Sequence, residues 1–395
     1  MSQARVHGAG PTGCLAALAL AQVGWQVHLH DPLDASGLLR RQRAYALTHS
    51  SFGLLDRLGL WQMLEPQLVP FSSLELWDQG TGRQCQFNAA DLGPGRRPGG
   101  AASGADADAE AEAVGWIVQH GPLMELLLQQ LQASEQVSLQ LGRAAPDPEA
   151  AGIAAVDLVV AADGSQSPSR QAAGLGWLER GYDQACLTVQ VRLRGARPNQ
   201  AWELLRPEGP FAVLPLGGDA FQLVWSASAR RLRQLESLDG AAFLDQLAGA
   251  LPEQLQPEAL LDQPRAFPVA LGLAWPLAKG PLVLVGESAH RCHPVGGQGL
   301  NLGWRDVACL QQLAGRVTAG RLAPEQLAAA YRWRRWPDLV ATLLATHLLV
   351  RLFSNRSRLL LPLRRLGLGL LNRAPLLRRL SLAAMTNGPC RLGQR

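Results

Sequence analysis

The chain has 395 residues, 47% of them hydrophobic and 17% charged, with a formal net charge of +5. This length exceeds that of one ordinary domain and the composition excludes extensive disorder, so two or three folded domains are expected. The six cysteines are widely spaced and form no Cys-x-x-Cys pair, which argues against a disulfide framework and favours a reducing cytosol.

The N-terminal segment shows a strand, turn, helix and strand pattern that is typical of dinucleotide-binding proteins. The predicted pieces are a strand at residues 4–7, a turn at 8–13 (GAGPTG), a helix at 14–23 and a strand at 27–30. Gly8 permits the tight turn, Gly10 lets the backbone approach a diphosphate, and Gly13 allows the helix to pack closely on the strand. The diphosphate would meet the free N–H groups of the helix N-terminus, and Asp31 is placed to bind an adenosine ribose. The pattern predicts a dinucleotide site without distinguishing FAD from NAD.

The middle of the chain carries weaker signals. Residues 93–113 contain glycine, alanine and acidic residues without apolar periodicity, which predicts a flexible insertion with no functional role. Residues 156–170 (VDLVVAADGSQSPSR) predict an apolar strand that runs into Asp163, a pattern that many folds share. Residues 187–192 and 221–226 alternate in polarity, as expected for strands that are half exposed on one face.

Residues 282–310 (LVLVGESAHRCHPVGGQGLNLGWRDVACL) form a denser motif. A buried strand at 282–285 leads through Gly286 to Glu287, a glycine-rich loop follows, and a helix is expected to begin near Leu300. The loop offers backbone N–H groups at a helix N-terminus with a carboxylate beside them. This arrangement suits the ribityl chain and the pyrimidine edge of a flavin, where the reduced ring carries negative charge.

Two other uses of this loop fit less well. His290, Cys292 and His293 form one close cluster, and the chain has no second cluster that would complete a zinc site. No Lys-Ser or Lys-Thr pair follows the glycines, so a nucleotide-phosphate loop is also excluded. No metal site is therefore predicted.

The basic character of the chain belongs to its C-terminal region. Residues 331–395 contain thirteen arginines and a single acid, Asp338. Leucine clusters alternate with arginine pairs over residues 356–382, and Pro362 and Pro375 are expected to divide this stretch into short helices. Two interpretations stay open, a helical cap with a solvated arginine face and a basic patch that binds anionic lipid. No uninterrupted apolar run of about 18 residues occurs, so a membrane-spanning helix is not predicted.

The three motifs, in this order and spacing, resemble those of the FAD-dependent aromatic hydroxylases typified by p-hydroxybenzoate hydroxylase. The greatest similarity is to the ubiquinone-biosynthesis hydroxylases, which act on polyprenylated phenols. Further similarity extends over residues 41–61 (RQRAYALTHSSFGLLDRLGLW), 209–225 (GPFAVLPLGGDAFQLVW) and 293–307 (HPVGGQGLNLGWRDV).

The resemblance implies a set of cofactor-binding residues. They are Gly8, Gly10, Pro11, Gly13 and Asp31 for the ADP half of FAD, Arg43 and Asp163 nearby, Gly286 and Glu287 for the ribityl chain, and Pro294, Gly296, Gly297, Gln298, Gly299, Leu300 and Asn301 around the isoalloxazine ring. The family usually has aspartate at the position of Glu287, so the carboxylate of this chain is displaced by one methylene.

The resemblance also implies an α/β fold with a Rossmann-like FAD-binding domain built on a parallel sheet. The predicted domains are the FAD-binding domain at residues 1–68, 115–176 and 268–330, an inserted, mostly antiparallel substrate domain at 69–114 and 177–267, and a basic helical region at 331–395.

The implied activity is hydroxylation of a polyprenylated phenol with NAD(P)H and O2 as co-substrates, through a flavin C4a-hydroperoxide. NAD(P)H would bind transiently, because no second dinucleotide motif is present. His290 and His293 are the nearest titratable groups, either as a base or as residues that orient the loop. No nucleic-acid partner is expected. The expected location is the cytoplasm, with a peripheral position on the inner face of the membrane as a further option.

Two alternatives of a different kind remain at this point. The chain could be a FAD-binding assembly or regulatory subunit without turnover. Two features favour this alternative: glutamate at position 287 where the family usually has aspartate, and the lack of an identified base. It could also be a related flavoenzyme that acts on another apolar substrate. Flavin halogenases fit less well, because their Trp-x-Trp-x-Ile-Pro motif is missing and the only lysine is Lys279.

Overall fold

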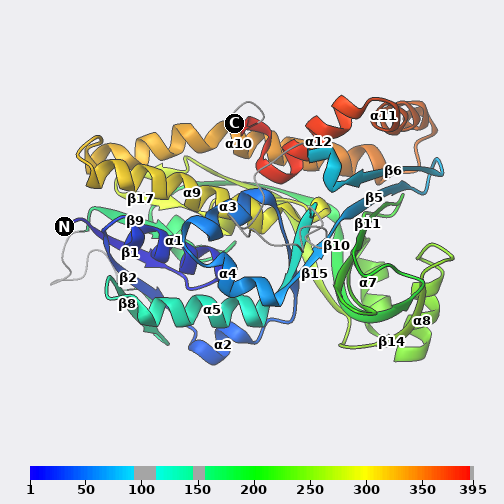
Figure 1. Ribbon diagram of the computed structural model, residues 1–395, viewed down its shortest axis with the longest axis horizontal. Helices are drawn as coiled ribbons and strands as arrows, with labels where there is room; N and C mark the ends of the chain where they lie inside the picture. The colour runs from blue at the N-terminus through cyan, green and yellow to red at the C-terminus, as the bar shows by residue number, and fades with distance from the viewer. Residues whose placement is uncertain (93–112, 146–155, 392–395) are drawn as a thin grey trace, which may run out of the picture.

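The computed structural model describes residues 1–92, 113–145 and 156–391. The predicted insertion at 93–113 therefore lies outside the described residues, except for its last one. The chain forms two sheet-centred parts side by side, and the C-terminal helices extend along both of them (Figure 1).

The first part is built on a six-stranded sheet. Its strands, in spatial order, are β16 (Ala278–Lys279), β17 (Leu282–Leu284), β9 (Leu158–Ala161), β1 (Gln3–His7), β2 (Gln26–Asp31) and β8 (Val137–Leu141). All neighbours are parallel except the β16/β17 pair. The helices α1 (Pro11–Gln22), α5 (His120–Ala133) and α9 (Gln298–Thr318) pack with this sheet around one apolar core. The predicted Rossmann-like parallel sheet is confirmed.

The carboxyl ends of the parallel strands bring the three sequence motifs together. Strand β1 leads into the first glycine turn, β9 leads into Asp163, and β17 leads into Gly286. Because parallel strands share one carboxyl edge, segments that are more than 100 residues apart in the chain become neighbours there. This edge is where open α/β sheets bind their ligands.

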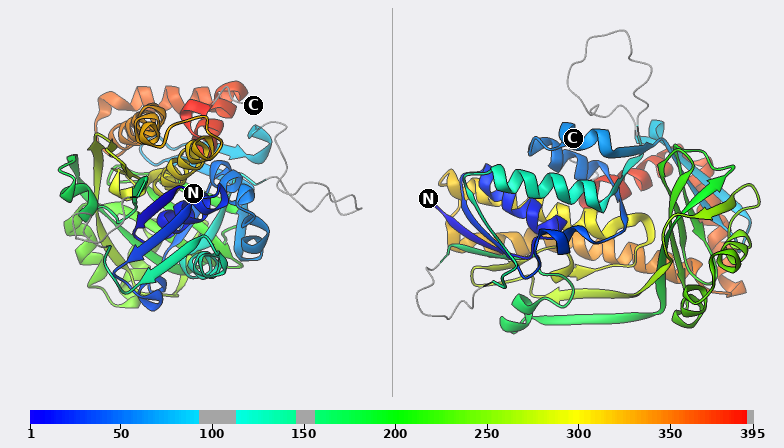
Figure 2. Two further views of the ribbon diagram at one scale, coloured as in Figure 1. Left: turned by 90° about the vertical axis from the view of Figure 1, so that its left-hand side faces the viewer. Right: turned by 90° about the horizontal axis from the view of Figure 1, so that it is seen from below.

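The second part is a nine-stranded sheet. Its strands are β18 (His290–Arg291), β15 (Arg265–Trp275), β10 (Gly176–Arg194), β13 (Ala220–Ala227), β12 (Phe211–Gly217), β11 (Gln200–Leu205), β5 (Ser73–Asp78) and β6 (Arg83–Asn88), with β14 (Gln256–Leu260) paired to β10. All pairs are antiparallel except β11 and β5. The long strands β10 and β15 run together from the first part into the second (Figure 2).

The two faces of this sheet differ. The helices α7 (Ala229–Glu236) and α8 (Gly240–Ala248) pack near one face, where the alternate residues of β10 join an apolar core. The predicted alternation at residues 187–192 is confirmed by the burial pattern of β10. At residues 221–226 the prediction of a half-exposed strand is wrong, because five of the six residues are buried. Strand β13 lies between two neighbours, and its other face meets a cavity instead of solvent.

The smaller elements connect these layers. A three-stranded antiparallel sheet is formed by β3 (Ala44–Leu47), β7 (Gly115–Gln119) and β4 (Leu68–Phe71). Short helices are α2 (Ala35–Leu39), α3 (His49–Arg57), α4 (Trp61–Leu64), α6 (Pro168–Ala172), and the 3-10 turns η1 (Glu65–Gln67), η2 (Ala89–Leu92), η3 (Gly286–Ser288), η4 (Val295–Gly297), η5 (Arg358–Leu360) and η6 (Pro389–Arg391).

Three helices form the C-terminal region: α10 (Pro324–Phe353), α11 (Leu361–Arg373) and α12 (Pro375–Asn387). Pro362 and Pro375 lie in the first turns of α11 and α12, where the missing N–H costs no hydrogen bond. They divide the segment as predicted. Helix α10 is long and apolar enough to cross a membrane by length and composition, and 39% of its most apolar window is buried inside the structure.

The predicted domain boundaries remain a prediction, but the strands can be compared with them. The boundary at residue 268 lies within β15, a single strand of the second sheet. The boundary at residue 331 lies within α10.

Candidate functional site

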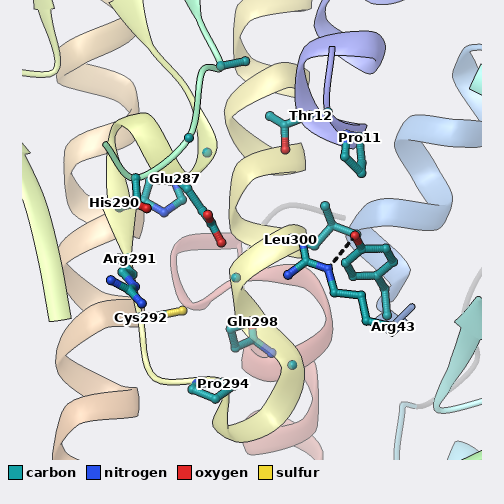
Figure 3. Close-up of a pocket in the computed structure, with 18 of the residues that line it drawn as sticks. Pro11, Thr12, Arg43, Glu287, His290, Arg291, Cys292, Pro294, Gln298 and Leu300 are labelled. Atoms are coloured by element: carbon teal, nitrogen blue, oxygen red, sulfur yellow. Dashed lines mark hydrogen bonds between the residues drawn. The ribbon is translucent and has the colours of Figure 1, made fainter. Parts of the chain in front are cut away.

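A cavity of about 1570 Å³ extends from the carboxyl edge of the parallel sheet to the nine-stranded sheet. Figure 3 shows part of its lining, with Pro11 and Thr12, Arg43, and residues from Glu287 to Leu300. All the sequence-predicted cofactor residues line it except Gly13 and Asn301. The cavity exceeds the usual volume of a small-ligand pocket, about 300–1,000 Å³, which leaves room for a large cofactor together with a second molecule.

The three glycines of the first motif have different surroundings. A Cβ atom on Gly13 would lie 1.8 Å from the Gly8 carbonyl oxygen, and one on Gly8 would lie 2.5 Å from the Ala162 oxygen. Gly8 also has a φ of +96°, which favours glycine. A Cβ atom on Gly10 would meet no described atom of the chain within 4 Å. Gly8 and Gly13 are therefore required for packing, whereas Gly10 leaves space beside the N-terminus of α1.

The two aspartates at the strand ends organise the backbone around this space. Asp31 accepts hydrogen bonds from the amides of Ala9 (2.6 Å) and Leu33 (2.8 Å), so it connects the first turn to the end of β2. Asp163 accepts a hydrogen bond from the Ser169 amide (3.0 Å) near the start of α6. Each carboxylate keeps lone pairs for a ligand on the cavity side.

Two histidines outside the predicted set, His7 and His30, also line this end of the cavity. Nε2 of His7 and Nδ1 of His30 are buried, and neither has a hydrogen-bond partner among the residues that the structure describes. Burial lowers the pKa of His7 to about 4, so its ring is neutral at pH 7. Buried polar atoms without partners usually receive them from a ligand or water. Together with the open space at Gly10, they fit the adenosine and diphosphate of FAD.

Arg43 approaches the cavity from the opposite wall. Its Nε donates to the Tyr45 hydroxyl (2.8 Å), and this oxygen also contacts Nδ1 of His120 (2.8 Å). Nε2 of His120 in turn contacts the Leu38 carbonyl (2.7 Å). This chain of contacts fixes Arg43 in place. No sequence signal points to Tyr45 and His120, because one lies in a strand of the small sheet and the other at the start of α5.

Glu287 projects into the same space as Arg43, and the two side chains face each other (Figure 3). Burial alone would lower the pKa of Arg43, but Tyr45 and Glu287 raise it above its usual value. Glu287 is exposed to the cavity, whereas its neighbour Gly286 is buried and donates its amide to Asp306 (2.9 Å). The carboxylate is therefore held by a fixed turn and is free to bind ligand hydroxyls.

The glycine-rich loop that follows has two residues with left-handed backbone, Gly296 (φ +68°) and Gly297 (φ +61°). The Gly296 amide donates to Glu203 (3.1 Å), and the Gly297 amide donates to the Pro294 carbonyl (2.9 Å). These two amides are thus engaged within the protein. The amides at Gln298 to Leu300 lie in the first turn of α9, where N–H groups have no partner within the helix, so these are the amides that can bind a ligand.

Gly13 and Asn301 act from outside the cavity. Asn301 is fully buried and donates to the carbonyls of Ala46 (2.7 Å) and Gly297 (2.8 Å). Its side-chain oxygen accepts hydrogen bonds from Thr48 and Ser51. Asn301 therefore connects the glycine-rich loop to the segment after β3.

The two candidate histidines are both held by the protein. Nε2 of His290 contacts Asp306 at 2.7 Å, in a buried cluster that also contains Arg335. His293 is fully buried, does not line the cavity, and accepts a hydrogen bond from the Val295 amide (3.2 Å). Burial lowers the pKa of His293 to about 4. Both contacts fit residues that orient the loop.

The cluster of His290, Cys292 and His293 does not converge on one point. His290 contacts Asp306, and His293 packs edge-on against the Tyr182 ring at 5.2 Å. Over residues 1–92, 113–145 and 156–391, no group of three or more histidine, cysteine or acidic side chains is placed to hold a metal ion.

The far half of the cavity is lined by the nine-stranded sheet and the C-terminal helices. Apolar groups dominate this half, namely Phe71, Leu74, Leu76, Ala201, Leu205, Ala212, Leu214, Val224, Ala345, Leu349, Ala384 and Met385. Two buried polar side chains, Glu203 on β11 and Gln222 on β13, also line this half, and the Oε1 atom of Gln222 has no hydrogen-bond partner in the described parts of the chain. Neither residue is predictable from the local sequence, because each lies within a largely apolar strand.

Comparison with known proteins identifies relatives that span most of the chain. Residues 1–343 match the protein family described as FAD binding domain. The chain is 30% identical to 3-demethoxyubiquinol 3-hydroxylase of Escherichia coli, over 95% of this chain and 96% of that protein. It is also 30% identical to the ubiquinone hydroxylase UbiL of Rhodospirillum rubrum, over 95% of this chain and 87% of that protein.

Solved structures share the fold at lower identity. The p-nitrophenol 4-monooxygenase PnpA of Pseudomonas putida superposes with a TM-score of 0.73 at 17% identity, covering 98% of this chain and 99% of that one. A point variant of Klebsiella pneumoniae HpxO, solved with FAD, has a TM-score of 0.70 at 19% identity, covering 99% of this chain and 100% of that one.

Proposed function

The chain belongs to the FAD-dependent hydroxylase family that includes the ubiquinone hydroxylases, and we propose that it hydroxylates the aromatic ring of a polyprenylated phenol in the biosynthesis of ubiquinone or a similar quinone. NAD(P)H and O2 are the proposed co-substrates. The observation that supports this best is a single cavity, which carries FAD-type contacts at one end and an apolar lining with one buried carboxylate at the other.

FAD would lie with its ADP half against Gly10, Asp31 and the first turn of α1, and with its ring beside the glycine-rich loop. When bound, it supplies the redox chemistry that takes electrons from NAD(P)H and inserts one atom of O2 into an electron-rich ring. The protein contributes binding and orientation. The amides at Gln298 to Leu300 and the N-terminus of α9 favour negative charge on the pyrimidine edge.

The substrate would occupy the apolar half of the cavity. Leucine and phenylalanine side chains from β4, β5 and β12 cover the floor, and α10 and α12 cover the opposite side. An aromatic ring with a prenyl tail removes its own apolar surface from water there, at about 25 cal/mol per Å². The same lining excludes water from the oxygen-transferring position.

The C-terminal helices also support a peripheral position on an anionic membrane. Their outer surface, which we call the tail surface, exposes Leu359, Leu363, Leu366, Leu370, Leu376, Leu377 and Leu380 together with Arg356, Arg358, Arg365, Arg373 and Arg379. Leucine can enter the lipid interface while arginine binds anionic headgroups. A polyprenylated substrate resides in the membrane, and α10 and α12 also line the cavity, so the proposed location is the cytoplasmic membrane face.

The function can be tested with purified protein and a short-tailed probe, 2-geranylphenol. We expect a yellow protein whose NAD(P)H oxidation is stimulated by the phenol, with one oxygen atom from ¹⁸O2 in the product. The matching non-aromatic geranyl alcohol serves as the control and should not stimulate the reaction. Retained FAD without phenol-stimulated NAD(P)H oxidation would instead indicate a FAD-binding subunit without turnover.

A further inference from the structure

Glu203 lines the apolar half of the cavity. It belongs to β11, where Ala201, Glu203 and Leu205 alternate toward the cavity. Directly across the neighbouring strands, the residues in register with Glu203 are Leu76 on β5 and Ala212 on β12. The row continues through Val224 on β13 and Thr188 on β10, and all of these residues line the cavity. From β5 to β10 the other members of this row are apolar or neutral, and Glu203 is its acidic member; the row ends on β15 at the exposed Arg265, which is in register with Thr188.

Within the described residues, the Glu203 carboxylate makes one hydrogen bond. Its Oε2 atom accepts the hydrogen bond from the Gly296 amide at 3.1 Å. Over the described parts of the chain, no cation lies within ion-pair distance of it. Only 6% of the residue is exposed. Burying a carboxylate without a cation costs several kcal/mol, and packing at this position would be better served by an apolar side chain.

We infer that Glu203 accepts a hydrogen bond from the ring hydroxyl of the bound substrate and then removes its proton. This inference rests on the proposed function, since it requires a phenol in the apolar half of the cavity. Glu203 is bonded to the loop at Gly296, which lies against the proposed position of the flavin ring. The substrate hydroxyl is thereby anchored at a fixed distance from the oxygen-transferring group.

The proton transfer is balanced without any redox change. The O–H bond of the phenol breaks and an O–H bond forms on Glu203, while the bonding electron pair stays on the phenol oxygen. The ring becomes more electron-rich and reacts more readily with an electrophilic oxygen atom. After oxygen insertion the ring loses its C–H proton to solvent and regains aromaticity, and Glu203 returns its proton to the ring oxygen.

The surroundings of Glu203 support this exchange. Burial raises its pKa to about 7, and the Gly296 hydrogen bond opposes this only in part. A base whose pKa lies near the working pH is the most effective. Of the elements around it, η4 and β12 contain no titratable side chain, and β10 contributes the Cys186 thiol, whose pKa burial raises to about 12. On β5 the residues beside Leu76 are Glu75 and Trp77, which do not line the cavity.

The first test is Glu203→Gln, which keeps the shape and the acceptor for the Gly296 amide. With 2-geranylphenol at pH 7 we expect kcat to fall about 100-fold, as for removal of a general base, while KM changes by less than about threefold and FAD content is unchanged. The matched control is Glu75→Gln, the same change on the adjacent strand, where the carboxylate accepts from Gln200 (2.9 Å) outside the cavity. Equal kcat values for the two variants would overturn the inference.

The pH profile separates a base from a structural group. The carboxylate must be ionised to act, so kcat of the native protein is expected to rise with pH through about 7 and then level off. In Glu203→Gln, kcat should follow the ionisation of the phenol itself, at a pH of about 10. Ring-fluorinated 2-geranylphenol is more acidic than 2-geranylphenol. Glu203→Gln should therefore oxidise the fluorinated phenol faster than the parent phenol, whereas the native protein should not. Lack of selective recovery would contradict proton removal by Glu203.

Binding gives a measurement that does not depend on turnover. The native protein should bind 2-geranylphenol about tenfold more tightly than its O-methyl ether, because a hydrogen bond to a charged acceptor is lost in the ether. Glu203→Gln should reduce this ratio to about threefold or less, as measured by calorimetry. A native ratio near one contradicts the inference even if the protein is an active hydroxylase. Failure of the native protein to bind or oxidise any phenol contradicts the proposed function instead.

Discussion

Gly10 and Gly13 occupy the same turn but have opposite structural roles. The space beside Gly10 is open on the cavity side, whereas a Cβ atom on Gly13 would collide with the Gly8 carbonyl at 1.8 Å. Gly10→Val should therefore fold with a melting temperature within a few degrees of the native apoprotein and bind no FAD. Gly13→Ala should lower the stability of the fold itself, because α1 must move away from β1.

Thermal unfolding and flavin absorbance of the two variants check this pair. A yellow Gly10→Val protein would show that the space beside Gly10 is not used by FAD. A Gly13→Ala protein as stable as the native chain would contradict the packing argument. Gly121→Ala on α5 is the control and should leave both stability and flavin content unchanged, since a Cβ atom there meets nothing within 4 Å in the described parts of the chain and Gly121 does not line the cavity.

His293 gives the fold a pH dependence. Burial lowers its pKa to about 4, compared with about 6.5 in the unfolded chain. Between these values the unfolded state binds more protons, so stability is complete above pH 6.5 and decreases as the pH falls toward 4. His293→Asn keeps an acceptor for the Val295 amide without a titrating ring. The melting temperature of this variant should fall less steeply between pH 6.5 and 4.5, and parallel curves would contradict the argument.

At the scale of elements, a buried charge cluster joins α9 to α10 and to the third motif. Asp306 on α9 accepts from Nε of Arg335 on α10 (2.7 Å), from the Gly286 amide (2.9 Å) and from His290 (2.7 Å). Asp338 binds both Arg335 (2.7 Å) and Arg305 (2.9 Å). Burial would raise the pKa of Asp306, but Arg335 and the hydrogen bonds hold it below its usual value.

Removing the charge of Asp306 should therefore be costly. Asp306→Asn leaves Arg335 buried with one partner fewer, and breaking a buried pair typically costs about 3–5 kcal/mol of unfolding free energy. Denaturant unfolding of the apoprotein measures this. Asp56→Asn, an exposed change on α3, is the control and should stay within about 0.5 kcal/mol of the native chain. A similarly small effect at Asp306 would show that the cluster adds nothing to stability.

The elements of the FAD-binding part were predictable because local signals and periodicity agree there. The glycines of the first motif, the apolar run of β17 and the prolines of the C-terminal helices each determine structure over a few residues. The prediction that β13 has an exposed face is wrong. Alternating polarity in a sequence shows that the two faces of a strand differ, but it does not show whether solvent or protein covers each face. One of its faces meets the apolar core and the other meets the cavity.

The candidate site was predictable in its cofactor half and not in its substrate half. Asp31 is the last residue of β2, and Glu287 follows the end of β17 by three residues, so the strand-and-turn pattern of each motif predicts where these carboxylates lie. Glu203 and Gln222 lie within strands of largely apolar sequence. His7 is the last residue of β1, and no sequence motif singles it out. Their importance depends on register between strands and on burial, which arise only when distant segments pack together.

At the scale of the whole molecule, the C-terminal helices have both an inner and an outer role. Inside, α10 and α12 close the apolar half of the cavity with Thr342, Ala345, Leu349 and Met385. Outside, together with α11, they lie along one side of the molecule (Figure 2) and present the tail surface. Part of the arginine set is used structurally. Arg364 is buried against backbone carbonyls, and Arg378 pairs with Asp91. The helical cap and the lipid-binding patch are thus compatible.

The tail surface leads to a prediction for membrane binding. The protein should co-sediment with vesicles that contain anionic lipid, and high salt should release it because salt screens surface charges. Replacing Arg365, Arg373 and Arg379 together by Gln should weaken binding about 100-fold, since each arginine near an anionic surface contributes about 1 kcal/mol. The control replaces Arg230, Arg233 and Arg316, which are exposed elsewhere and change the net charge equally. If both triple variants lose affinity to the same extent, the attraction is a property of net charge. Equal binding of the native protein to neutral and anionic vesicles, or no binding, rejects the patch and leaves a helical cap whose outer leucines face solvent.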